Sequence, residues 1–176
     1  IAGGSDTKSL ISFVSTIAAS TVVGGDGDDS VVFNGTNSGS TILGGAGADS
    51  LFFNAGVSGA SIVSGTGNDS LFFTNVTQTK ITSGSDADGY LTFSGSAHQT
   101  TITGGSGADT LAFAAGLTGV KADLGSGNDS IYAATDVMSS TLIGGAGNDT
   151  LQFAAATYFT GASILGGDGA DSVIFA

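Results

Sequence analysis

The sequence predicts an all-β fold, a right-handed parallel β-solenoid of about eight coils with about 20 residues each. Phenylalanine recurs at intervals of twenty residues, and a glycine-rich turn that ends in aspartate precedes most of these positions. The chain contains 31 glycines but neither proline nor glutamate, so a strong helix former is absent and we do not expect a helical protein. A repeat of this length is typical of stacked coils.

The core is predicted from pairs of apolar residues that alternate in position, as in a short strand with one buried face. One pair per coil ends in an aromatic residue, at Phe33, Phe53, Phe73, Phe93, Phe113 and Phe153, with Ala133 at the one gap. A second strand before each turn is marked by Val22, Ile42, Ile62, Ile81, Ile102, Leu142 and Ile164. We therefore expect two strands and two turns per coil.

Twenty residues cannot bury a core alone, so successive coils have to pair their strands in parallel, about 4.8 Å apart. A globular sandwich of short strands is the alternative, but it does not require a strict period. Both ends of the sequence resemble cuts through a continuing stack. We expect residues 1–176 to form a single solenoid segment of a longer polypeptide.

Each turn supplies one aspartate, and stacking places these carboxylates in a row where they repel one another unless a cation lies between them. Oxygen donors without a His or Cys cluster favour calcium. We expect one row of several Ca²⁺ ions, held by Asp29, Asp49, Asp69, Asp88, Asp109, Asp129, Asp149 and Asp171. Backbone carbonyls of turns with left-handed glycines complete the sites, for example at Gly24, Gly25, Gly27, Gly44, Gly45, Gly47, Gly144, Gly145 and Gly147.

The segments GGAGNDTLQF and GGDGDDSVVF resemble the nonapeptide G-G-x-G-x-D-x-U-x of RTX proteins, the haemolysin-type calcium-binding repeat. The resemblance extends from about Gly24 to Phe175 and implies a β-roll-like, calcium-binding solenoid. In the usual RTX β-roll, nonapeptides follow one another and ions lie along both edges. Here the second half of each coil, such as FNAGVSGASIV, has no aspartate turn. This difference indicates the single-row variant of bacterial surface-layer proteins and large adhesins.

Two turns are irregular. In GGSDTKSL, Lys8 stands where the aspartate is expected, and its ammonium group is either solvated or in contact with Asp29. In SGSDADGYLTF, the core positions Leu91 and Phe93 keep the period, so the turn holds one extra residue, with Asp86 and Asp88 near the row.

Composition excludes several classes of function. A net charge of −12 argues against nucleic acid and anionic membranes, and no apolar run is long enough to span a membrane. The chain has no cysteine, as expected for a secreted bacterial protein that is stabilised without disulfides. His98 is the one histidine and has no triad or carboxylate-pair spacing around it. We expect no enzymatic activity.

These features predict a calcium-stabilised structural segment of an extracellular bacterial surface layer, fibril or adhesin. The alternatives are a secretion and folding module of an RTX enzyme or toxin, and an ice-binding solenoid with aligned threonines. An outward apolar strip, which we define as Val32, Phe52 and Phe72, indicates contact with copies of the chain or with neighbouring domains.

Overall fold

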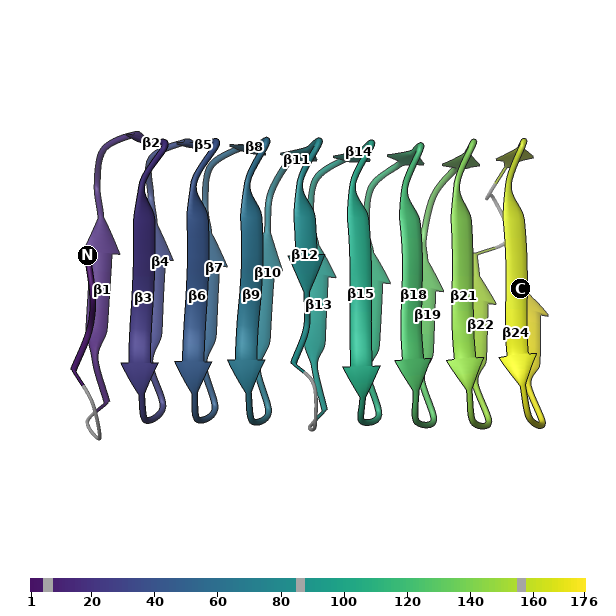
Figure 1. The fold of residues 1–176 in the computed structure, drawn as a ribbon. Helices are drawn as coiled ribbons and strands as arrows, with labels where there is room; N and C mark the ends of the chain where they lie inside the picture. The colour runs from purple at the N-terminus through teal and green to yellow at the C-terminus, as the bar shows by residue number, and fades with distance from the viewer. Residues whose placement is uncertain (5–7, 85–87, 155–157) are drawn as a thin grey trace.

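The computed structural model describes residues 1–4, 8–84, 88–154 and 158–176 and confirms the predicted β-solenoid. The chain winds through about eight turns of about 20 residues, and all strand pairs are parallel. Three sheets run along the stack, and the glycine–aspartate turns lie along one edge (Figure 1). The described part of the chain contains no helix, and therefore no helix that could cross a membrane.

Sheet 1 is formed by the four-residue strands that follow the turns. Neighbouring strands pair in register at a spacing of twenty residues, so that Leu51 lies beside Leu71 and Phe53 beside Phe73. Among the described residues its strands are β1 (Leu10–Phe13), β4 (Ser30–Phe33), β7 (Ser50–Phe53), β10 (Ser70–Phe73), β13 (Tyr90–Phe93), β16 (Thr110–Phe113), β19 (Ser130–Ala133), β22 (Thr150–Phe153) and β25 (Ser172–Phe175).

Sheet 3 is formed by the longer strands that lead into the turns. Its alternating burial places one residue inward and the next outward, as Ile42 and Leu43 show. In the described ranges its strands are β3 (Thr21–Asp26), β6 (Thr41–Ala46), β9 (Ser61–Thr66), β12 (Lys80–Thr82), β15 (Thr101–Ser106), β18 (Lys121–Ser126), β21 (Thr141–Ala146) and β24 (Ser163–Asp168).

Sheet 2 corrects the expectation of two strands per coil, because the polar segment after sheet 1 forms a third, two-residue strand. Its first residue turns inward and is buried at Val57, Leu117 and Val137. The strands described are β2 (Ile17–Ala18), β5 (Asn37–Ser38), β8 (Val57–Ser58), β11 (Val76–Thr77), β14 (Ala97–His98), β17 (Leu117–Thr118), β20 (Val137–Met138) and β23 (Phe159–Thr160).

The core lies between the three sheets and consists largely of apolar side chains that stack from coil to coil. The rings of Phe33 and Phe53 are 4.7 Å apart and nearly parallel, and the same stacking continues along sheet 1 as far as Phe113. Ala133 interrupts the ladder as the sequence predicts. Stacking fixes the register of every coil, and with it the position of the turns.

Candidate metal centre

Each turn uses glycine in two ways. In the turn from Gly24 to Asp29, Gly25 and Gly27 have φ values of 124° and 96°, a region that side chains disfavour. Gly24 is not in this conformation, which corrects the expectation that all three glycines are left-handed. Gly24 is required by close packing instead, because an added methyl group would overlap the carbonyl oxygen of Gly44 in the next coil.

The aspartates that end these turns form a buried row. Their side chains are at most 2 % exposed at Asp29, Asp49, Asp69, Asp109, Asp129 and Asp149, and Asp171 in the last coil is half-buried. The carboxylates are joined by hydrogen bonds from the preceding coil, because the backbone N–H of Asp29 donates to Oδ1 of Asp49 at 2.8 Å. The same bond recurs along the row at 2.6–3.0 Å.

The second carboxylate oxygen has no such partner. Oδ2 is buried and accepts no hydrogen bond in Asp29, Asp49, Asp109, Asp129 and Asp149. A buried oxygen of a charged group without a partner is costly, and a cation compensates that cost directly. The row therefore presents unpaired negative charge at regular intervals inside the turns.

Backbone carbonyl oxygens lie close to the Oδ2 atoms of the row aspartates. A methyl group at Gly24 would overlap the Gly44 carbonyl oxygen and lie 2.7 Å from Oδ2 of Asp29, so two oxygens from adjacent coils lie close together beside the glycine. Gly44 and Gly104 have equivalent surroundings. We call this pair of oxygens, with the glycine beside it, the cradle of a coil. Calcium takes carboxylate and carbonyl oxygens as ligands, so the donor set fits it.

The described residues include no group of three or more His, Cys, Asp or Glu side chains that converges on one point. A cation in a cradle would therefore be held by few carboxylates and by backbone carbonyls. Such a site depends on the stacking of coils more than on any one side chain.

Burial changes the acidity of the row. It raises the pKa of Asp49, Asp109 and Asp129 from 3.8 to about 6. The charges of Asp69 and Asp29 raise the pKa of Asp49 further, whereas the hydrogen bond from the Asp29 backbone lowers it. Without a cation, these three carboxyl groups hold their protons more tightly than an exposed aspartate does.

Asp88 does not stand in the row, contrary to expectation. Ser83 aligns with Gly104 and Tyr90 with Thr110, which confirms the extra residue in this turn and brings Gly89 into the row. The backbone N–H of Gly89 donates to Oδ1 of Asp109 at 2.7 Å. Asp88 is exposed.

Asp88 instead belongs to an outer ladder that the sequence analysis missed. Its Oδ1 accepts the backbone N–H of Ala108 at 2.8 Å, as Asp28 does from Ala48. The signal was present, because an Asp or Asn precedes the row position in several turns. Asp86 lies outside the described residues.

Lys8 also lies one residue before the row. Leu10 pairs with Ser30, so Ser9 takes the place of the aspartate, and its backbone N–H donates to Oδ1 of Asp29 at 2.6 Å. The expectation that Lys8 stands at the aspartate position is therefore wrong, because the paired core residues fix the register of this coil. Counting twenty residues back from Asp29 gives Ser9.

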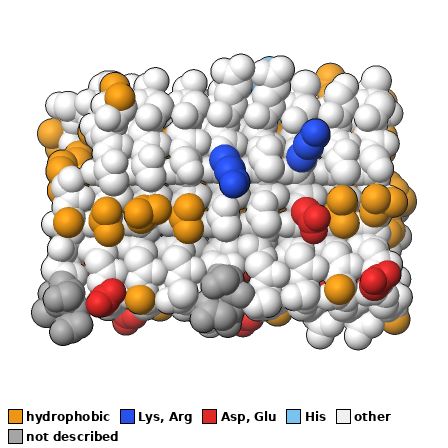
Figure 2. Space-filling model, viewed as in Figure 1, with side chains coloured by type: hydrophobic (Ala, Val, Ile, Leu, Met, Phe, Trp, Pro, Cys, Tyr) orange, Lys and Arg blue, Asp and Glu red, His pale blue; other side chains and the backbone are white. Residues whose placement is uncertain are grey.

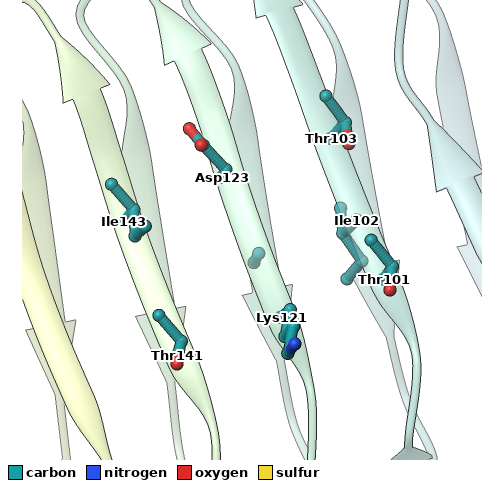
Figure 3. Close-up of a pocket in the computed structure, with 8 residues that line it drawn as sticks. Thr101, Ile102, Thr103, Lys121, Asp123, Thr141 and Ile143 are labelled. Carbon is teal, nitrogen blue, oxygen red and sulfur yellow. The ribbon is translucent and has the colours of Figure 1, made fainter.

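A shallow hollow of about 350 Å³ lies on the outer face of sheet 3, on the strands and away from the aspartate row (Figure 3). Lys121 and Asp123 extend from one strand, with threonines on both sides. His98 lies in β14 of sheet 2, where its side chain is exposed. The described residues thus bring no histidine and carboxylates together.

The fold and the turns define a class of protein, the parallel β-solenoids with a carboxylate row in glycine-rich turns. The family model of the RTX calcium-binding nonapeptide repeat matches residues 95–116 and 139–152 in four copies. Over these two stretches the chain is similar to the RTX calcium-binding repeat, whose described ligand is calcium.

Other comparisons add little. No curated protein matches the chain in sequence. One solved structure is similar, a hyperactive, Ca²⁺-dependent, β-helical antifreeze protein from an Antarctic bacterium, with 18% identity and a TM-score of 0.39. The match covers 96% of this chain and 78% of that one. This likeness is too weak to transfer any property.

Proposed function

We propose that the chain is a non-enzymatic, calcium-stabilised structural segment of an extracellular bacterial protein, such as a surface layer, a fibril or a large adhesin. The observation that carries this proposal is the row of buried carboxylate oxygens without hydrogen-bond partners, which at Asp29, Asp49 and Asp109 lie close to a backbone carbonyl of the next coil. The RTX repeats support calcium as the ion. A long, regular stack suits a spacer or a building element.

The proposed ligands are the carboxylates of Asp29, Asp49, Asp69, Asp109, Asp129, Asp149 and Asp171, together with carbonyls of the turns. Asp88 is left out because Gly89 occupies its place in the row. Glycine–aspartate turns line one edge of the stack, so the proposal is a single row of ions (Figure 1).

Calcium-dependent folding tests the proposal. In excess chelator, repulsion along the row should leave the chain loosely folded, and millimolar Ca²⁺ should increase its β-structure in a circular dichroism titration. A ligand at 100 times its Kd stabilises the folded state by about 2.7 kcal/mol per site. Mg²⁺, which keeps its water and demands a tighter octahedral shell, should not replace Ca²⁺.

Two adjacent aspartates provide a matched pair of variants. Asp29→Asn replaces a buried row carboxylate and should weaken calcium binding, whereas Asp28→Asn replaces an exposed one and retains an oxygen that can accept the Ala48 N–H. Equal calcium affinity of both variants, or full β-structure in chelator, would refute the proposed row.

The secretion and folding module of an RTX enzyme or toxin remains the alternative, and a catalytic domain elsewhere in the same gene would favour it. Ice binding is less well supported. Thr21, Thr41, Thr101 and Thr141 align on the outer face of sheet 3, but Lys80 and Lys121 interrupt them.

A further inference from the structure

The glycine position of the cradle holds serine in two coils, at Ser64 and Ser83, and a large apolar residue, Leu124, in a third. Leu124 aligns with Gly104 and Gly144, and its side chain is fully buried. At Gly104 and Gly144 an added methyl group would come within 2.6 Å of Oδ2 of the aspartate in the same coil. In the third coil, the register puts a leucine side chain at the place of that methyl group.

The same coil has lost bulk elsewhere in its core. Ala122 stands in the row of Ile102 and Leu142, and Ala133 stands between Phe113 and Phe153. Both alanines are buried. This coil therefore lacks the isoleucine and phenylalanine side chains that fill most of its neighbours.

Leu124 and Val120 compensate for that loss. Both are fully buried in the core cluster, and Val120 stands where Ser140 and Thr100 lie in the adjacent coils. Apolar side chains at these two positions replace the volume that the two alanines leave. The packing of this coil thus includes a leucine at the register position where the neighbouring coils have a glycine next to their row aspartate.

We propose that Leu124 closes the cradle of its own coil to calcium, which removes Asp129 from the ligands proposed above, so that this coil is held together by apolar packing and divides the ion row. The proposal rests on the proposed function, because it presupposes that open cradles bind Ca²⁺. A leucine side chain offers no oxygen donor and excludes water, and calcium requires six to eight oxygen ligands. The ion sites on either side then form two separate groups.

The test is a count of bound calcium per chain, measured by equilibrium dialysis at saturating Ca²⁺ followed by elemental analysis. Leu124→Gly should bind one more ion than the wild-type chain. In chelator its melting midpoint should be lower than that of the wild type, because apolar packing is lost. If Leu124→Gly does not fold even with calcium, Leu124→Ser, which places the residue of Ser64 at this position, should show the same gain.

Two controls identify the site of the gained ion. Adding Asp129→Asn to Leu124→Gly should remove the gain. Leu117→Ala empties an equally buried position in sheet 2, away from the turns, and should lower stability without changing the ion count.

The possible outcomes separate the two proposals. A wild-type chain that binds no calcium contradicts the proposed function. A wild-type chain that binds calcium, with neither Leu124 variant gaining an ion, contradicts only the role given to Leu124. A gain that persists with Asp129→Asn also overturns it, because the new ion would then lie elsewhere.

Discussion

Asn37 lies in the apolar interior although its amide has no partner there. It is 1 % exposed, and both its Oδ1 and Nδ2 are without hydrogen bonds. It occupies the inward position of β5, between Ile17 and Val57 of the neighbouring coils. Burying an unpaired amide costs about 1–3 kcal/mol by mutational measures. The residue is a local weakness in an otherwise regular ladder.

Replacing Asn37 with valine should therefore stabilise the folded chain by about 1–3 kcal/mol. Valine already fills the equivalent position at Val57, so its shape suits the site. Chemical denaturation at saturating calcium measures the change in the free energy of unfolding. Ser38→Val on the exposed face of the same strand is the control and should change it by less than about 0.5 kcal/mol. A less stable Asn37→Val protein would show that the amide has a partner in solution.

At the scale of the strand and turn, the sequence predicted those elements that carry a strong periodic signal. Sheets 1 and 3 follow from the apolar pairs that recur every twenty residues. The two-residue strands of sheet 2 could not be predicted in this way, because a strand with a single inward residue, such as Val57 or Ala97, shows no alternation of apolar and polar residues. The sequence pattern of each such strand is too short to be recognised. The strand forms because the adjacent coils supply the strands with which it pairs.

The aspartate row was predicted from the same period, and the register places seven of the eight expected carboxylates in it. The prediction is wrong at Asp88. The sequence shows the extra residue in this turn, but not that the extra residue moves Asp88 out of the row. The backbone N–H bonds to Oδ1 and the role of Leu124 were also missed. Both depend on which atoms adjacent coils bring together, and spacing alone does not contain that information.

The pKa shifts of the turns predict how stability without calcium depends on pH. The folded-state pKa of Asp49, Asp109 and Asp129 is about 6, above the value of 3.8 expected for the unfolded chain. Between these values the folded state holds protons that the unfolded state has released, so its stability falls as pH rises. The contribution is fully present below about pH 4 and is lost as pH rises through about 6.

In chelator the melting midpoint, followed by circular dichroism from pH 4.5 to 7.5, should therefore decrease with increasing pH. With saturating Ca²⁺ the trend should reverse, because protons compete with the ion for the same carboxylates. If the melting midpoint in chelator is constant or rises over this pH range, the aspartate row is not what destabilises the calcium-free protein.

At the scale of the whole molecule, apolar side chains gather on the outside of the first coils. The strip of Val32, Phe52 and Phe72 lies half-buried on sheet 1, with the rings of Phe52 and Phe72 stacked 4.9 Å apart. On sheet 3, Val23, Leu43 and Val63 form a second outward row. Figure 2 shows hydrophobic side chains aligned on the sheet 3 face of the early coils, lysines and an acidic residue farther along, and hydrophobic side chains again over the last coils. The surface is therefore uneven along the stack.

This asymmetry leads to a prediction about assembly. If the strip on sheet 1 is a lateral contact between copies, the calcium-loaded chain should self-associate, and Phe52→Ser with Phe72→Ser should shift it towards monomer in analytical ultracentrifugation. Full burial of one such ring contributes about 1.5–3 kcal/mol, so losing two weakens a dimer by orders of magnitude. Both residues face outward and the core beneath them is unchanged, so calcium binding should persist.

Leu43→Ser with Val63→Ser is the matched pair on the outer face of sheet 3. If that pair abolishes association and the phenylalanine pair does not, the contact lies on sheet 3. If neither pair changes the association, the outward apolar rows are not the interface.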